Sequence, residues 1–136
     1  MQRLSLAHCN IHDLGIEILA ETLVHTRLRY LDISWCKLSA ESVPFLCTFI
    51  KNNASLEKLL MQHNQIAVTG EPTGTNSAMK EIIRALESHP SLQYLDVSAT
   101  KLGAANLALL LDLQARDKLR LQVLQARKNE IEGNEI

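Results

Sequence analysis

A leucine-centred pattern recurs five times along this 136-residue chain, and it constrains the fold more strongly than any other feature. Its second copy runs Leu28-x-x-Leu31-x-Ile33-x-x-Cys36-x-Leu38, and the five copies begin near residues 1, 28, 56, 92 and 121. The second leucines of successive copies, Leu4, Leu31, Leu59, Leu95 and Leu124, lie 27, 28, 36 and 29 residues apart. A period of this length is typical of a solenoid in which each copy is one structural unit.

The third interval is longer than the others because it contains the segment 67–76, which is rich in Gly, Pro and Thr. This composition predicts an inserted surface loop. A chain of 136 residues has the usual length of one domain. We therefore expect a single repeat domain over residues 1–136, with the loop insertion at 67–76.

Each copy predicts a short strand followed by a helix. The alternation at Leu31-x-Ile33 favours a strand with one buried face, and the chain turns away three residues later, at Cys9, Cys36, Asn64, Thr100 and Asn129. Asn and Thr side chains bond exposed backbone groups at such a turn, and a reduced Cys does so weakly. Helical patterns cover 13–25, 39–50, 77–87 and 104–115, with Asp13 as a predicted N-cap and the apolar run 107–113 expected in the core.

This frame resembles the leucine-rich-repeat family, and specifically its ribonuclease-inhibitor-like class, whose units have this length and alternate Cys or Asn at the turn. The resemblance implies an α/β fold: a right-handed solenoid, or horseshoe, with a parallel β-sheet on the concave side and α-helices on the convex side. Thr100 and Ala126 depart from the family's usual residues. Neither end carries the polar cover that terminal repeats need. The sequence therefore fits a fragment of a longer array or a chain whose ends are covered by something else, including self-association.

Charge and composition exclude several partners. The net charge is −1 and no basic run occurs, which argues against nucleic acid. The longest apolar stretch, 107–113, is far below the ~20 residues of a membrane span, and the first 14 residues lack the apolar core of a signal peptide. Three cysteines without a CxxC pair fit a reducing compartment, so we expect a cytoplasmic chain. No phosphate-binding glycine motif occurs, and we expect no cofactor and no small-molecule substrate.

The frame also predicts which side chains face outward on the concave sheet. Both tyrosines and the single tryptophan fall at these positions, and such residues are enriched in binding hot spots. Asp32 and Asp96 are expected to receive Arg or Lys from a partner. The predicted partner-binding residues are Tyr30, Asp32, Trp35, Lys58, Leu60, His63, Tyr94, Asp96 and Arg127.

Other readings of the same residues are weaker. His8 beside Cys9 suggests a Cys–His nucleophile, but the Cys positions match a buried structural column, so we expect no enzyme activity. His8 and His63 lie two strands apart, roughly 10 Å, which is too far for one metal ion. We expect a protein-interaction module, which includes an enzyme inhibitor or an effector that covers an active site. The alternatives are a GTPase-activating-type regulator using His8, His63 and Lys128 on one rim, or a structural segment of a larger repeat protein.

Overall fold

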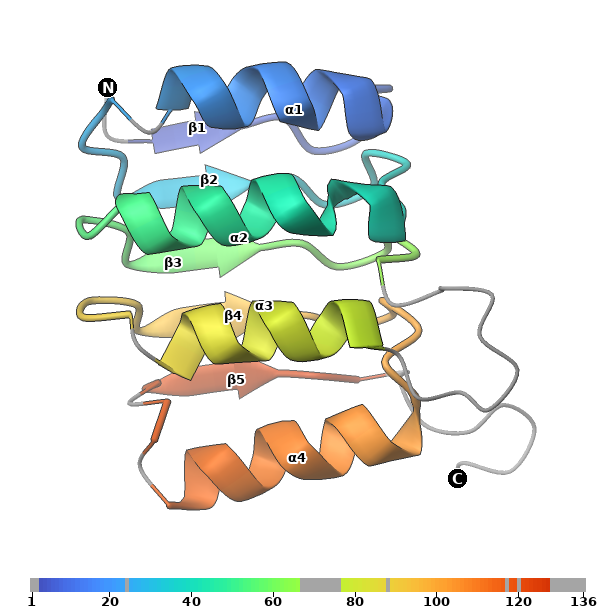
Figure 1. Ribbon diagram of the computed structural model, residues 1–136, viewed down its shortest axis with the longest axis vertical. Helices are drawn as coiled ribbons and strands as arrows, with labels where there is room; N and C mark the ends of the chain where they lie inside the picture. The colour runs from blue at the N-terminus through green and yellow to red at the C-terminus, as the bar shows by residue number, and fades with distance from the viewer. Residues whose placement is uncertain are drawn as a thin grey trace.

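The computed structural model describes residues 3–23, 25–66, 77–87, 89–116, 118–119 and 121–127. Within them, five parallel strands form one sheet in the order of the sequence (Figure 1). The strands are β1 (Arg3–Ser5), β2 (Tyr30–Asp32), β3 (Lys58–Leu60), β4 (Tyr94–Asp96) and β5 (Val123–Gln125). The predicted loop 67–76 and residues 128–136, with Asn129 and Lys128, lie outside the described residues.

The helices connect successive strands and lie side by side in a second layer along the sheet (Figure 1). They are α1 (His12–Leu23), η1 (Ala40–Ser42), α2 (Val43–Asn52), α3 (Ser77–Glu87) and α4 (Gly103–Ala115). The predicted alternation of strand and helix, and with it the α/β solenoid, is confirmed. None of these helices, in the part of the chain that the structure describes, is long and apolar enough to cross a membrane.

The segment 39–50, predicted as one helix, begins instead as a 3-10 turn. Ser39 accepts a hydrogen bond from the Glu41 backbone and the Val43 N–H donates to Ala40 O, while α2 starts at Val43. Pro44 has no N–H to donate to Ala40 O, so the α-helical bonding pattern cannot begin earlier.

The register of the sheet follows the leucine frame. Leu4 pairs with Leu31, Leu31 with Leu59, Leu59 with Leu95 and Leu95 with Leu124. The three central leucines are buried, whereas Leu4 and Leu124, on the edge strands, are only partly covered. Since side chains alternate along a strand, the residues on either side of each leucine face away from the helices. We call that side of the sheet the open face.

Cys36, Asn64 and Thr100 bond backbone groups at the turns after β2, β3 and β4, as the sequence predicted. The buried Asn64 side chain accepts hydrogen bonds from the Cys36 and Leu38 backbones at 3.0 and 3.1 Å and donates to Ile33 O at 2.8 Å. Cys36 Sγ donates to Leu6 O at 3.0 Å, and Thr100 Oγ1 to Val97 O at 2.8 Å. Cys9 differs from the expected burial: it is exposed, because β1 has a neighbouring strand on one side only in the described sheet.

Asp13 is not the N-cap that the sequence suggested. Helix α1 begins at His12, and the Asp13 carboxylate reaches to the next repeat, where it accepts hydrogen bonds from the Ser39 backbone and from the Ser39 and Ser42 hydroxyls. Partial burial opposes its charge, but these hydrogen bonds outweigh that effect and lower the pKa of Asp13. The carboxylate therefore ties the start of α1 to the start of the next helical segment.

The apolar run 107–113 is only partly in the core. Leu110 is buried and Leu107 and Leu113 pack partly against the core, whereas Leu109 and Leu111 are 36% and 50% exposed. A helix that is apolar nearly all round cannot bury every side when, among the described residues, only α3 packs beside it.

Candidate interaction surface

The open face carries two rows of side chains that the register aligns across the strands. One row is Arg3, Tyr30, Lys58, Tyr94 and Val123, and the other is Ser5, Asp32, Leu60, Asp96 and Gln125. Six of the nine residues predicted to bind a partner lie in these rows. The other three, Trp35, His63 and Arg127, lie in the turns that follow the strands.

In the first row, cationic and aromatic side chains alternate and contact each other. The Arg3 guanidinium carbon lies 4.4 Å from the centre of the Tyr30 ring, and Lys58 Nζ lies 5.4 Å from Tyr30 and 4.3 Å from Tyr94. These are cation–π distances. We call Arg3, Tyr30, Lys58 and Tyr94 the basic–aromatic ladder. Each ring thus contacts a cation of a neighbouring strand, which favours the observed ring orientation.

The two aspartates of the second row are already used within the chain. Asp32 Oδ1 accepts hydrogen bonds from the Ser34 backbone at 3.0 Å and from the Ser34 hydroxyl at 2.6 Å. Asp96 Oδ1 accepts from the Ser98 backbone at 2.9 Å. Such bonds to a residue two positions later are typical of Asp at a turn. The structure therefore gives both carboxylates a local role in ending the strand, which the sequence analysis did not foresee.

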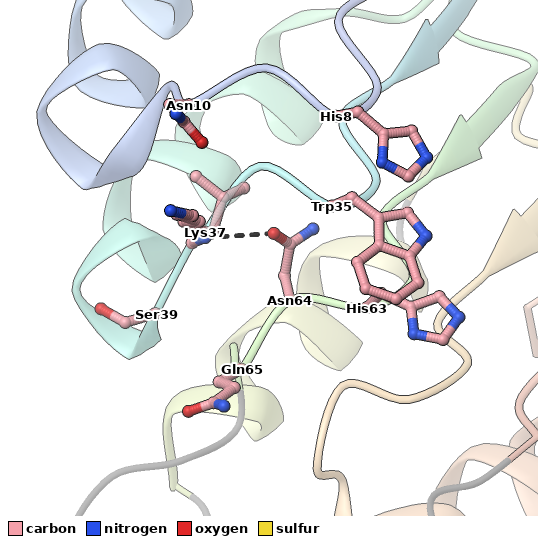
Figure 2. A pocket seen from close by; sticks show the side chains of 9 residues that line it. His8, Asn10, Trp35, Lys37, Ser39, His63, Asn64 and Gln65 are labelled. Carbon is pink, nitrogen blue, oxygen red and sulfur yellow. Dashed lines mark hydrogen bonds between the residues drawn. The ribbon is translucent and has the colours of Figure 1, made fainter.

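A second aromatic stack lies along the rim, one position before the Cys/Asn column. The ring of Trp35 stacks on His8 at 5.4 Å and on His63 at 3.9 Å, with interplanar angles of 13° and 12°. We call His8, Trp35 and His63 the aromatic rim. The indole fills the space between the two imidazoles, and its side chain is still 47% exposed. Figure 2 shows the three rings in one column beside a hollow of about 500 Å³ that Lys37, Ser39 and Gln65 also line.

The backbone of the rim explains how these rings come to protrude. His8, Trp35 and His63 have φ values of 64°, 56° and 60°, and Ala99, at the same position of the fourth copy, has 55°. This left-handed conformation is uncommon for residues other than Gly, Asn and Asp. Its recurrence at one position shows that the turn geometry, and not the individual side chain, imposes it.

The ladder and the rim meet at a hollow of about 400 Å³ on the open face. It is lined by eight residues, five of them among those predicted from the sequence: Trp35, Gln62, His63, Tyr94, Asp96, Ser98, Gln125 and Arg127. The side-chain oxygen of Gln62 is buried and accepts no hydrogen bond from the described residues. An unsatisfied buried acceptor costs about 1–3 kcal/mol relative to a paired one.

Two of the three thiols, those of Cys36 and Cys47, are buried and poorly suited to nucleophilic chemistry. Burial raises the pKa of the Cys36 and Cys47 thiols, which keeps them protonated and poorly nucleophilic. Over the described residues, no cluster of three or more His, Cys, Asp or Glu side chains is arranged to hold a metal ion.

Comparison with known proteins agrees with this geometry. Family models described as Leucine Rich Repeat match residues 27–49 and 1–20. The ribonuclease inhibitor of Mus musculus is 27% identical over 147 aligned residues, which cover 91% of this chain and 32% of that protein. The chain therefore contains leucine-rich repeats over these residues. It is similar to proteins of the ribonuclease-inhibitor-like class, and it spans about a third of the length of this mouse relative.

Three residues of the open face and its rim were absent from the predicted partner-binding set. Arg3 belongs to the ladder, His8 to the rim, and Gln62 contributes the unsatisfied acceptor. The alternation of cation and aromatic ring in the column Arg3, Tyr30, Lys58, Tyr94 was visible in the aligned repeats and could have revealed the first. The stacking of His8 and the environment of Gln62 depend on side-chain conformations that no alignment of repeats contains.

Proposed function

We propose that this chain is a non-catalytic protein-interaction module that binds a partner protein through the open face, on what we expect to be the concave side of a horseshoe. The observation that carries the proposal is the ordered aromatic surface: Trp35, Tyr30 and Tyr94 are each stacked against neighbouring side chains. Large rings that are already fixed lose little conformational entropy when they become buried. The leucine-rich-repeat family and the mouse relative support the same role.

The mouse relative's name states that it inhibits a ribonuclease, and we extend only the mode of action to this chain. A module of this shape inhibits an enzyme by covering its active site with the open face. Such a role needs no catalytic group of its own, in keeping with the buried, protonated thiols of Cys36 and Cys47. The three unpaired cysteines further support a reducing compartment such as the cytoplasm.

Affinity capture from a cytosolic extract tests this function. We compare the wild-type chain with a Trp35→Ala/Tyr94→Ala variant after circular dichroism has shown that both fold. Alanine is tolerated by the Trp35 backbone, since Ala99 occupies the same position with nearly the same φ. If each ring contributes about 2 kcal/mol, the variant loses more than about a hundredfold in affinity.

The matched control removes apolar side chains from the helical side of the molecule. Leu14 and Ile18 on α1 are 70% and 60% exposed, so Leu14→Ala/Ile18→Ala removes comparable exposed surface away from the open face. We expect this control to retain the captured partner. Equal recovery by the wild type and the Trp35→Ala/Tyr94→Ala variant would contradict binding through the open face.

A further inference from the structure

The cations of the basic–aromatic ladder have no carboxylate partner within the described residues. The ion pairs found there join Arg29 to Glu57, Arg84 to Glu81 and Arg116 to Asp112. Arg3 and Lys58 are absent from these pairs and lie instead over the faces of Tyr30 and Tyr94. A cation on an aromatic ring keeps donor groups free on the side away from the ring, and a carboxylate is the partner that these donors favour.

The surroundings of Arg3 and Lys58 add to the positive charge. Both line a hollow of about 340 Å³ together with Arg29, Tyr30 and Glu57. Glu57 is the one acidic residue of this lining, and its carboxylate is bound by Arg29 at 2.8 Å. The hollow is thus left with two cations that nothing in its lining neutralises.

The aspartates of the other row keep their own negative charge, but within the described residues they form no ion pair with Arg3 or Lys58. Asp32 and Asp96 turn an oxygen toward Ser34 and Ser98, at the opposite ends of the strands from the ladder row. The open face therefore presents a cationic, aromatic stripe at the start of the strands and an internally bonded acidic stripe at their ends.

We propose that the basic–aromatic ladder binds carboxylate side chains of an acidic segment of the partner protein. The inference rests on the proposed function and specifies the partner's chemistry: Asp or Glu side chains meet Arg3 and Lys58, while the tyrosine rings cover the intervening apolar atoms. This reverses the expectation from the sequence, in which Asp32 and Asp96 were to recruit basic residues.

The register also sets the spacing that such a segment needs. Arg3 and Lys58 lie on β1 and β3, two strand spacings apart, which corresponds to about 9.6 Å. A polyproline II peptide advances about 9.3 Å in three residues, so a Glu-Pro-Pro repeat places successive carboxylates at nearly this separation on one side. Such a peptide is a rigid probe of the ladder.

The experiment measures binding of fluorescein-labelled (Glu-Pro-Pro)n, (Gln-Pro-Pro)n and (Lys-Pro-Pro)n peptides of equal length by fluorescence anisotropy at low ionic strength. We expect the wild-type chain to bind the Glu peptide about tenfold more tightly than the Gln peptide, and the Lys peptide most weakly. Arg3→Gln/Lys58→Gln abolishes this preference, while Lys58→Arg keeps it because a guanidinium also stacks on tyrosine and binds carboxylates.

The control variant carries the same change of net charge elsewhere. Lys51 on α2 and Lys80 on α3 are exposed, and Lys51→Gln/Lys80→Gln is expected to bind the Glu peptide within about twofold of wild type. An equal loss in this control, a preference for the Lys peptide, or no preference for the Glu peptide would overturn the proposal. If Trp35→Ala/Tyr94→Ala still loses a captured partner, the interaction module stands and only its acidic partner is refuted.

Discussion

Asn64 shows how much of the stability of one repeat depends on a single side chain. Its buried amide satisfies two backbone N–H groups of the preceding repeat and the carbonyl of Ile33. Cys36, at the same position one repeat earlier, makes the equivalent donor contact to Leu6 O and a longer one to Ser34 O, and its thiol does not replace the two contacts that Asn64 Oδ1 accepts. The two residue types are therefore interchangeable in the sequence pattern but not in the number of hydrogen bonds.

Replacing Asn64 tests this difference at the residue scale. Asn64→Ala leaves three buried backbone groups unpaired, and we expect a loss of about 3 kcal/mol in the free energy of unfolding. Asn64→Cys retains a donor to Ile33 O and should lose clearly less. Urea denaturation followed by circular dichroism measures both, and equal losses would show that the hydrogen bonds of the amide do not matter.

At the scale of elements, His89 joins the turn before β4 to the turn before β3. Its Nε2 lies 2.9 Å from Asn53 O, and its Nδ1 accepts hydrogen bonds from the Ser91 and Leu92 backbones at 3.2 and 3.0 Å. This arrangement needs a neutral ring with the proton on Nε2. Burial lowers the pKa of His89 below its ordinary value of 6.5, more than the hydrogen bond to Asn53 raises it.

The lowered pKa of His89 predicts a loss of stability on mild acidification. Below about pH 6.5 the unfolded chain takes up a proton at this residue before the folded chain does, so the free energy of unfolding falls as the pH falls. The decrease is at most about 1.4 kcal/mol per pH unit and ends once the pH is below the folded-state pKa. Urea denaturation between pH 7.5 and about pH 5 measures it.

The repeat itself supplies the variant and the control for this pH dependence. Asn53 occupies the position equivalent to His89, so His89→Asn substitutes a residue that the fold already uses there and does not titrate. We expect this variant to lose the dependence. His25, at the same position one repeat earlier, is exposed, and His25→Asn should leave the dependence unchanged. A pH dependence that persists in His89→Asn would assign it to another group.

In the molecule as a whole, α1 and α4 lie at the two ends of the described stack (Figure 1), and both expose apolar side chains. Leu14 and Ile18 on α1 are 70% and 60% exposed, and Leu109 and Leu111 on α4 are 36% and 50% exposed. Inner helices cover such positions by contact with a neighbour on each side, as α2 does with α1 and α3. Exposed apolar patches of this kind favour association.

We therefore expect the isolated chain to self-associate through these end helices. Leu14→Gln/Ile18→Gln should lower the association constant at least about tenfold, because burial of each such side chain is worth about 1.5–3 kcal/mol. Sedimentation velocity over a range of concentrations measures the effect, with Trp35→Ala/Tyr94→Ala as the control that leaves it unchanged. A wild-type chain that stays monomeric over the whole range would contradict this expectation.

The repeat frame and the columns of outward-facing residues could be predicted from short-range periodicity. Copies with the same pattern stack in register and bring equivalent residues side by side. The parallel order of the strands was implied by the resemblance to leucine-rich-repeat proteins, and the structure confirms it. The leucines of the frame, the Asn64 turn and the positions of Tyr30, Trp35 and Tyr94 could all be read from the periodicity.

What those side chains contact could be seen only in the folded structure. Arg3 stacks on Tyr30, Asp32 bonds Ser34, Asp13 reaches Ser39, and Trp35 lies between two histidines. These contacts depend on side-chain rotamers and, except for Asp32 with Ser34, on the separation of about 4.8 Å between neighbouring strands. The residues of those other contacts lie a whole repeat apart in the chain. A periodic pattern predicts which residues share a face. Which cation, ring or hydroxyl on that face contacts which other group depends on three-dimensional packing.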